Sequence, residues 1–166
     1  MSWTIEAWSE IHPRWGEMVR YIEGEELDRA VLAAGRLVDE GRLLAAVHGG
    51  EIVGFLMFLV QPIGPEMDCP VLCDSEGTAL TEAKIRAFHV REAQRGQGIG
   101  TALQRAVLRL AGELGCYQVR SLSSYTRHAN YAIKLKLGFV AHPTIRQLKD
   151  RQEPSVYWIK RVGDAR

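Results

Sequence analysis

Three glycines at alternate positions follow a basic residue near the middle of the chain, in the stretch Arg95-Gly96-Gln97-Gly98-Ile99-Gly100. An apolar run typical of a strand precedes this stretch, and an apolar pattern with helical spacing follows it. The first turn of a helix has N–H groups without internal partners and lies at the positive end of the helix dipole, so a phosphate can accept several hydrogen bonds there. Glycine lets the backbone approach such a ligand closely. The order of elements therefore predicts a phosphate site, with Arg95 as an added cation.

Other nucleotide-binding loops fit the glycine stretch less well. A P-loop requires Gly-Lys-Ser/Thr, which is absent, and a dinucleotide-binding loop requires Gly-x-Gly-x-x-Gly near an early strand. Here the third glycine comes one residue early, and the motif lies beyond the middle of the sequence. A glycine-rich turn that only caps the following helix is the remaining alternative.

A strand expected at Lys84–Val90 leads into the glycine stretch and sorts its side chains onto two faces. Strand alternation, extended back to residue 82, places Glu82, Lys84, Arg86 and Phe88 on one face and Ala83, Ile85, Ala87 and His89 on the other. The first face has most of the groups that could do chemistry. His89 is another possible general base, since its ordinary pKa of about 6.5 is suitable, but it points with the apolar set, where a histidine is more often packed in the core.

The remaining elements follow from periodicity, turn residues and glycine positions. We expect, in order, a strand at Trp3–Trp8, a helix with Leu27, Val31, Ala34 and Val38 on one face that ends at Gly41, a hairpin of Leu43–His48 and Glu51–Val60 turned at Gly49-Gly50, a long loop at Gln61–Thr81, the strand Lys84–Val90, a helix at Gly98–Leu114, a strand at Tyr117–Ser123, a helix at Ala129–Leu137 and a closing strand at Val156–Arg161. Strands that follow helices imply crossovers, so part of the sheet is expected to be parallel.

Composition limits the classes of partner and location. A length of 166 residues fits one domain, 1–166, with a disordered tail after Val162. A formal net charge of +1 gives no general attraction to nucleic acid or to an anionic membrane. Three cysteines without a CxxC pair favour a reducing compartment and predict no metal site. With no signal core at the start and no apolar run long enough to span a bilayer, we expect a cytoplasmic protein.

The sequence resembles the GNAT superfamily of N-acetyltransferases over nearly its whole length. The family signature Gln/Arg-x-x-Gly-x-Gly/Ala matches Arg95, Gly98 and Gly100, and Leu137-Gly138-Phe139 resembles the common ending of a later helix. The resemblance implies a single-domain GNAT-like α/β fold. Its sheet is expected to be mixed but mostly antiparallel, with about six to seven strands, flanked by helices and splayed at the central parallel strands.

Resemblance to this family also implies acetyl coenzyme A as cosubstrate, without a metal. The loop and helix start, Arg95, Gly96, Gln97, Gly98, Ile99, Gly100 and Thr101, are then expected to hold the pyrophosphate. Main-chain groups of Phe88, His89 and Val90 are expected to pair with the pantetheine arm, and Asn130 to bond to it or to cap the helix or face water.

The implied reaction is direct transfer of the acetyl group to a primary amine of a small molecule or a protein. An alkyl ammonium, with a pKa of about 10.4, must lose a proton before it attacks. Glu82 is our candidate base, because its spacing from Arg95 is similar to that of the glutamate in histone-acetylating members; a solvated carboxylate is the alternative. A backbone N–H near Val90 is the expected oxyanion donor.

The leaving thiolate needs a proton donor, for which the residues offer alternatives. Resemblance places a tyrosine four residues before the glycine of Leu-Gly-Phe, but this chain has Lys134 there, which we expect to be a solvated helix residue. Tyr131 or Tyr125 could take the role. The alternative function is a non-catalytic acyl-coenzyme A sensor or interaction module of the same fold. The protein could also form a homodimer.

The acceptor amine is not identified by sequence. Four acidic residues of the long loop could attract a cationic substrate, although acidic loops are usually only solvated. These residues are Glu66, Asp68, Asp74 and Glu76.

Overall fold

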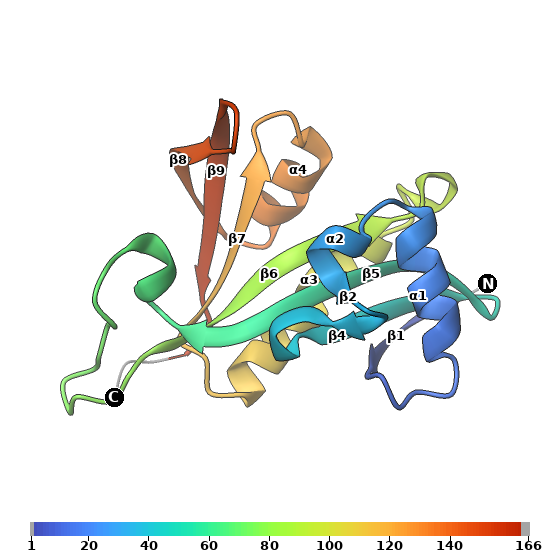
Figure 1. Ribbon diagram of the computed structural model, residues 1–166, viewed down its shortest axis with the longest axis horizontal. Helices are drawn as coiled ribbons and strands as arrows, with labels where there is room; N and C mark the ends of the chain where they lie inside the picture. Colours follow the sequence, from blue (N-terminus) through green and yellow to red (C-terminus); the bar gives the residue numbers. More distant parts are fainter. Residues whose placement is uncertain (1, 164–166) are drawn as a thin grey trace. The chain divides into compact units, whose positions relative to one another are not determined.

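The computed structural model describes residues 2–163, and within them a mixed seven-stranded sheet has the order β1-β4-β5-β6-β7-β9-β8 (Figure 1). A separate two-stranded sheet pairs β2 with β3. The strands are β1 (Trp3–Trp8), β2 (Leu32–Ala33), β3 (Arg36–Leu37), β4 (Arg42–His48), β5 (Glu51–Pro62), β6 (Thr81–Val90), β7 (Gln118–Ser124), β8 (Val140–Gln147) and β9 (Gln152–Arg161). The α-helices are α1 (Trp15–Gly24), α2 (Asp28–Val31), α3 (Ile99–Glu113) and α4 (His128–Lys136). The predicted mixed α/β class is confirmed.

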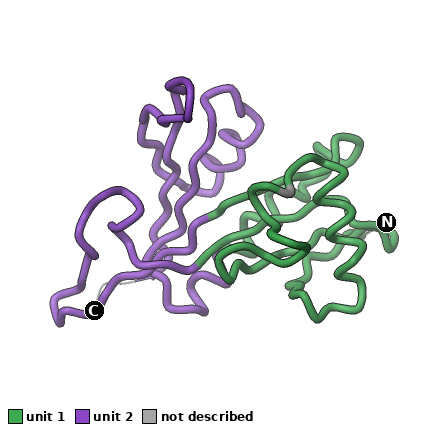
Figure 2. Tube along the Cα trace, viewed as in Figure 1, with its two compact units in different colours: residues 1–59, 85–107 green, residues 60–84, 108–166 purple. Residues whose placement is uncertain are grey.

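The chain divides into two compact units, residues 1–59 with 85–107 and residues 60–84 with 108–166 (Figure 2). The expectation of a single domain stays a prediction, and the expected disordered tail falls mostly outside the described residues. Among residues 2–163 no helix is long and apolar enough to cross a membrane.

In the first unit, α1 packs on an antiparallel array of β1, β4 and β5. The β4–β5 hairpin turns at Gly49 and Gly50, whose φ angles of 57° and 84° are in the left-handed region that glycine adopts without steric cost. The predicted hairpin is therefore confirmed. Met18 and Ile22 of α1 are fully buried in one apolar cluster with side chains of β4 and β5 such as Phe55, so hydrophobic burial holds the helix to the strands.

The helix expected to carry Leu27, Val31, Ala34 and Val38 is wrong. A short helix, α2, ends at Val31, and the chain then makes the small β2–β3 hairpin through Ala34 and Gly35, with φ angles of 50° and 75°. Gly41, expected to end that helix, has a φ of −60° in extended backbone and follows a 3₁₀ turn instead.

Distant polar contacts explain this departure from helical periodicity. The indole Nε1 of Trp15 donates to the carbonyl oxygen of Gly35 at 2.9 Å, and the carboxylate of Glu10 accepts hydrogen bonds from Leu37 N and Arg36 Nε at 2.9 and 2.8 Å. These bonds stabilise the hairpin, whereas a helix over the same residues would leave all of them unmade.

In the second unit, β7, β9 and β8 form an antiparallel array. Tyr131 of α4 packs against Trp158 of β9, with ring centroids 4.9 Å apart, so α4 covers the face of the array that carries Trp158. Strand β8 was not predicted. Seven of its eight residues are exposed and it contains Pro143, so it has neither the alternation nor the composition of a half-buried strand.

The long loop of the second unit is tied to the sheet at both of its ends. Strand β5 continues to Pro62 and β6 begins at Thr81, so the loop is shorter than predicted, and β6 begins three residues before the predicted strand. The backbone N–H of Ile63 donates to Leu80 O, and that of Leu72 donates to Ile63 O, both at 2.9 Å. The loop therefore has a defined path from the end of β5 to the start of β6.

Candidate functional site

The glycine loop has the geometry of an anion site at a helix N-terminus. Strand β6 ends at Val90, Gly96 and Gly98 have φ angles of 78° and 83°, and α3 begins at Ile99. The carbonyl oxygen of Gly98 accepts the hydrogen bond of Ala102 N at 3.0 Å, so Gly98 is the residue that caps the helix. Because glycine has no side chain to occupy the first N–H groups of α3, these groups remain for a ligand.

The glycines at 96 and 98 are required by backbone conformation and not by crowding. An added Cβ at either position would meet no atom within 4 Å. A side chain would instead be strained by the positive φ, and at position 98 it would extend from the cap of α3. The loop thus presents bare backbone to the space before the helix.

Side chains beside the loop hold it in place. The Nε of Arg95 donates to the carbonyl oxygen of Val90 at 3.0 Å, which connects the loop to the last residue of β6. Gln97 donates to the side chain of Gln94 at 3.1 Å, and Gln94 Oε1 lies 3.2 Å from His48 Nδ1. Arg95 is exposed, so the rest of its guanidinium remains accessible to solvent.

His89 points into the core of the first unit. Its ring lies among Tyr21 and Phe55, with centroid distances of 6.1 and 6.4 Å, and its Nε2 is 3.1 Å from Glu25 Oε2. The side chain is 17% exposed, which agrees with the packed orientation predicted by strand alternation. Only the backbone of His89 therefore suits the cofactor role expected for Phe88, His89 and Val90.

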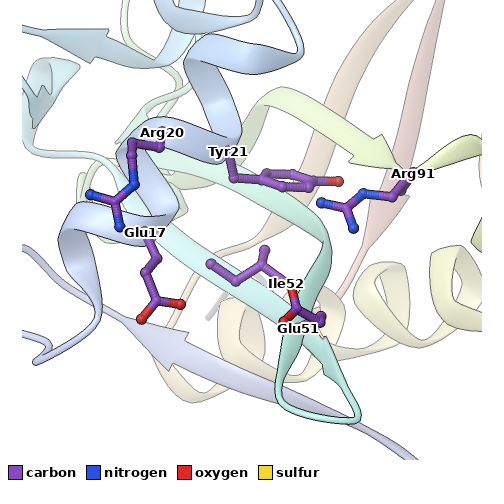
Figure 3. Close-up of a pocket in the computed structure, with 6 residues that line it drawn as sticks. All are labelled: Glu17, Arg20, Tyr21, Glu51, Ile52 and Arg91. Carbon is purple, nitrogen blue, oxygen red and sulfur yellow. The ribbon is translucent and has the colours of Figure 1, made fainter.

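A second feature of this unit is a hollow of about 270 Å³ beside α1 and the start of β5 (Figure 3). Tyr21 and Arg91 point toward each other there, with the guanidinium carbon 5.1 Å from the ring centroid. Burial, with the nearby charge of Glu25, raises the pKa of Tyr21 to about 12, so its hydroxyl stays protonated. Two acidic and two basic residues line the hollow, which gives it no preferred ligand charge; these are Glu17, Glu51, Arg20 and Arg91.

In the second unit, the carboxylate of Glu82 is completely buried, and both of its oxygens accept hydrogen bonds. Arg120 donates to it from Nε at 3.0 and 2.9 Å and from Nη2 at 2.6 Å, and the side chains of Gln61 and Gln118 donate at 3.1 and 2.8 Å. A carboxylate offers about four lone-pair sites, so these five contacts leave none directed at another proton donor. The alternative expectation, a solvated carboxylate at the strand end, is wrong.

Arg120, which sequence reasoning missed, connects this buried group to the long loop. Its Nη2 is also 2.5 Å from Glu66 Oε2, and Lys84 forms an ion pair with Glu66 Oε1. Arg120 is 1% exposed. The signal that could have found it is a charged residue within a strand expected inside the sheet, because a charge buried there requires a partner.

The side chains of α4 that face the sheet include unused hydrogen-bonding groups. Asn130 Nδ2 donates to Ser123 Oγ at 2.8 Å, while Asn130 Oδ1 is buried without a partner among residues 2–163. Within the same described part of the chain, Ser121 Oγ and Trp158 Nε1, on residues that face each other across β7 and β9, also lack hydrogen-bond partners. A ligand that reaches this side of the array could satisfy them.

The two candidate tyrosines differ in their surroundings. Tyr131 is partly buried against Trp158, its hydroxyl donates to Ser124 O at 3.2 Å, and burial raises its pKa. Tyr125 is 54% exposed. Tyr131 is thus held in one place and stays protonated, whereas the ring of Tyr125 is largely in solvent.

Lys134 is buried, which corrects the expectation of a solvated helix residue. The side chain is 1% exposed, and its Nζ lies 4.1 Å from the centroid of the Phe139 ring. Burial lowers the pKa of Lys134 to about 7. Near neutral pH this amine therefore exists in both its charged and neutral forms.

A pH-dependent stability difference is expected for Lys134→Met. The folded-state pKa of about 7 lies below the ordinary value of 10.5, so the unfolded wild type binds more protons between these pH values. The free energy of unfolding of the wild type should therefore rise relative to the variant above pH 7, by up to about 1.4 kcal/mol per pH unit. Urea unfolding from pH 6 to pH 10 measures this difference.

Lys136→Met is the matched control for this prediction, because Lys136 is on the same helix but exposed. Its free energy of unfolding should follow the wild type at every pH. Parallel curves for wild type and Lys134→Met would show that Lys134 titrates normally.

No group of three or more His, Cys, Asp and Glu residues that could hold a metal ion occurs within residues 2–163. Cys69 and Cys73 are exposed, Cys116 is buried, and all three are free thiols.

Known structures with the same fold were found across nearly the whole chain. NAA60 from Arabidopsis thaliana in complex with acetyl-CoA is 14% identical, with 97% of this chain and 99% of that chain covered and a TM-score of 0.75. An acetyltransferase of the GNAT family from Streptococcus pneumoniae is 13% identical, with 98% and 100% covered and a TM-score of 0.73. The ribosomal-protein-S18-alanine N-acetyltransferase from Escherichia coli is 15% identical, with 99% and 96% covered and a TM-score of 0.64.

The sequence itself was compared with protein families and with curated proteins. No curated protein matches the chain. The family model described as acetyltransferase (GNAT) family matches residues 5–139, a span that contains the glycine loop, the Glu82–Arg120 pair and α4. This chain therefore belongs to the GNAT family of acetyltransferases.

Proposed function

We propose that the chain is an N-acetyltransferase that moves the acetyl group of acetyl coenzyme A directly to a primary amine. The glycine-capped start of α3 carries this proposal, because its backbone N–H groups have no side-chain cap and suit a pyrophosphate. Solved relatives in fold that contain acetyl-CoA support the choice of cosubstrate.

We assign binding roles to the residues around the loop. The pyrophosphate is held by the backbone from Gly96 to Thr101, with Arg95 as an exposed cation. The pantetheine arm pairs with the main chain of Phe88, His89 and Val90. Asn130 offers its unpartnered Oδ1 to an amide N–H of that arm.

In the reaction, the nitrogen lone pair of the neutral amine attacks the thioester carbonyl carbon, the carbon–sulfur bond breaks, and the coenzyme leaves as a thiolate. One proton leaves the amine and one is gained by the thiolate. Glu82 in its present contacts has no lone pair for the amine proton, so we propose that it positions Arg120 and Glu66. It becomes a base only if Arg120 moves away from it.

Two groups on α4 are candidates for the proton donor to the thiolate. The Tyr131 hydroxyl is protonated at neutral pH, and the Lys134 ammonium has a pKa of about 7, below the thiol value of about 8.5. Either can deliver a proton without a further group. Tyr125, in solvent, is the less suitable candidate of the three.

A non-catalytic sensor of acyl-coenzyme A is the second candidate function. Glu82 is the carboxylate predicted as the base, but its oxygens are occupied by hydrogen bonds from Arg120. A protein without a free base suits a sensor better than an enzyme. A sensor would bind the cosubstrate but transfer nothing.

Release of free thiol from acetyl-CoA, measured with a panel of primary amines, tests the proposal. We expect amine-dependent thiol release, and mass spectrometry should find one acetyl group added to the amine. Loss of kcat in Tyr131→Phe or in Lys134→Met identifies the proton donor, with Lys136→Met as control. Acetyl-CoA binding without transfer to any amine would support the sensor instead.

A further inference from the structure

A hollow of about 460 Å³ lies within the second unit, formed by the long loop and one face of β7, β9 and β8. Glu66 and Asp68 come from the loop, Arg120 from β7, Tyr157 and Ile159 from β9, and His142 from β8. Trp158 alternates with Tyr157 and Ile159, so the hollow opens on the face of β9 opposite to the one that packs on α4.

Charge is layered in this hollow, with the cations beneath the carboxylates. Arg120 and Lys84 have side chains that are 1% and 13% exposed, whereas Glu66 is 34% exposed and Asp68 is an exposed residue. Arg120 and Lys84 form ion pairs with Glu66 and Glu82, and no ion pair of Asp68 is found among the described residues, so Asp68 leaves one negative charge at the hollow. A molecule entering from solvent therefore meets carboxylates first.

The apolar side chains of the hollow suit an organic ligand. The ring of Tyr157 and the aliphatic side chain of Ile159 provide an apolar floor for an aliphatic stem. Arg120 donates from Nε and Nη2 to the two glutamates, and its guanidinium carbon lies 5.3 Å from the centroid of the Tyr157 ring.

We propose that this hollow binds a positively charged alkylammonium group of the acceptor, with Asp68 as its carboxylate partner and Tyr157 and Ile159 against its stem. The inference rests on the proposed function, because it names the class of amine that the acetyltransferase takes. An anionic ligand is disfavoured, because the cations of Arg120 and Lys84 already form ion pairs with Glu66 and Glu82 and lie beneath the surface.

Binding of pentane-1,5-diamine, followed by amide shifts of the isotope-labelled protein and by calorimetry, tests the proposal. We expect shifts concentrated at Asp68 and along β8 and β9. Pentane-1,5-diol, a neutral molecule of the same length, should not bind, and added salt should weaken the diamine. Equal binding of the diol would overturn the proposal.

Asp68→Asn is the decisive variant. Asp68 has a φ of 56°, a left-handed conformation that Asn also adopts readily, so the variant removes charge with little backbone strain. We expect about fivefold weaker diamine binding, within the range of an exposed ion pair. Glu76→Gln, which removes the same charge from an exposed loop residue outside the hollow, should leave binding unchanged. Equal affinity of wild type and Asp68→Asn would also overturn the proposal.

Failure of this inference and failure of the proposed function give different results. Diamine binding is measured without acetyl-CoA, and acetyl-CoA binding is measured without an amine. Binding of acetyl-CoA with no diamine binding rejects only the hollow as an ammonium site. Diamine binding without acetyl-CoA binding rejects only the acetyltransferase proposal.

Discussion

Replacing Arg120 with Met is expected to lower the free energy of unfolding by about 3–5 kcal/mol, since removal of one partner leaves a buried charge uncompensated. Glu82 is completely buried, and three of its five hydrogen-bond contacts come from Arg120. Met replaces the aliphatic part of the Arg side chain and cannot donate, so the loss reports mainly on the charge and its hydrogen bonds. Urea unfolding at neutral pH measures the change.

Two comparisons make the Arg120 result specific. Arg109→Met breaks an exposed ion pair with Glu113 on α3 and should cost less than about 1 kcal/mol. The double variant Glu82→Gln with Arg120→Met should recover part of the stability, because it removes the uncompensated charge as well. A loss no greater than that of Arg109→Met would contradict the buried network.

The second large effect is expected for the glycine loop. In the double variant Gly98→Glu with Gly100→Glu, carboxylates occupy the start of α3, where they take the N–H groups and repel a phosphate. At a concentration of acetyl-CoA one hundred times its dissociation constant, the wild type should gain about 2.7 kcal/mol of stability. The variant should gain nothing. A thermal unfolding scan with and without acetyl-CoA measures this gain.

Gly77→Glu is the matched control for backbone strain. Gly77 has a φ of 82°, close to the 83° of Gly98, and it lies in the long loop of the second unit with open space around it. This control should lose a similar amount of intrinsic stability and still be stabilised by acetyl-CoA. Unchanged stabilisation of the double variant would show that the glycine loop is not the binding site.

Elements with strong local patterns were predicted well from sequence. Strand β1 has the predicted bounds, the Gly49-Gly50 hairpin is present, and α3 differs from its predicted range by one residue at each end. In each case the hydrophobic period and the turn residues indicate the same structure, so no distant contact is needed to decide it.

Elements decided by distant contacts were predicted poorly. The apolar spacing of Leu27 to Val38 suits a helix, but the bonds of Trp15 and Glu10 to the β2–β3 hairpin override it. Strand β8 was not predicted because its sequence has no apolar pattern at all. Its pairing with β9 is made by backbone groups, which leave no pattern in side-chain hydrophobicity.

The residues of the candidate site also differ in whether local sequence or distant contacts determine their positions. The glycine loop could be proposed as a phosphate site from sequence because its glycines and its helix are adjacent in sequence. Arg120 was missed because its partners Glu82 and Glu66 are 38 and 54 residues away. Lys134 was misjudged because its burial depends on how α4 packs, and a lysine between Ile133 and Leu135 on a short helix gives no local sign of that.

The exposed edge strand β8 has a consequence for self-association. An unpaired edge can recruit another chain into a continuous sheet, and proline inside such an edge interrupts the row of donors that the second chain would need. Pro143 lies in the middle of β8, and Arg146 adds a charge near its end. A homodimer of this protein is therefore expected to join through side-chain surfaces and not by extension of the sheet at β8.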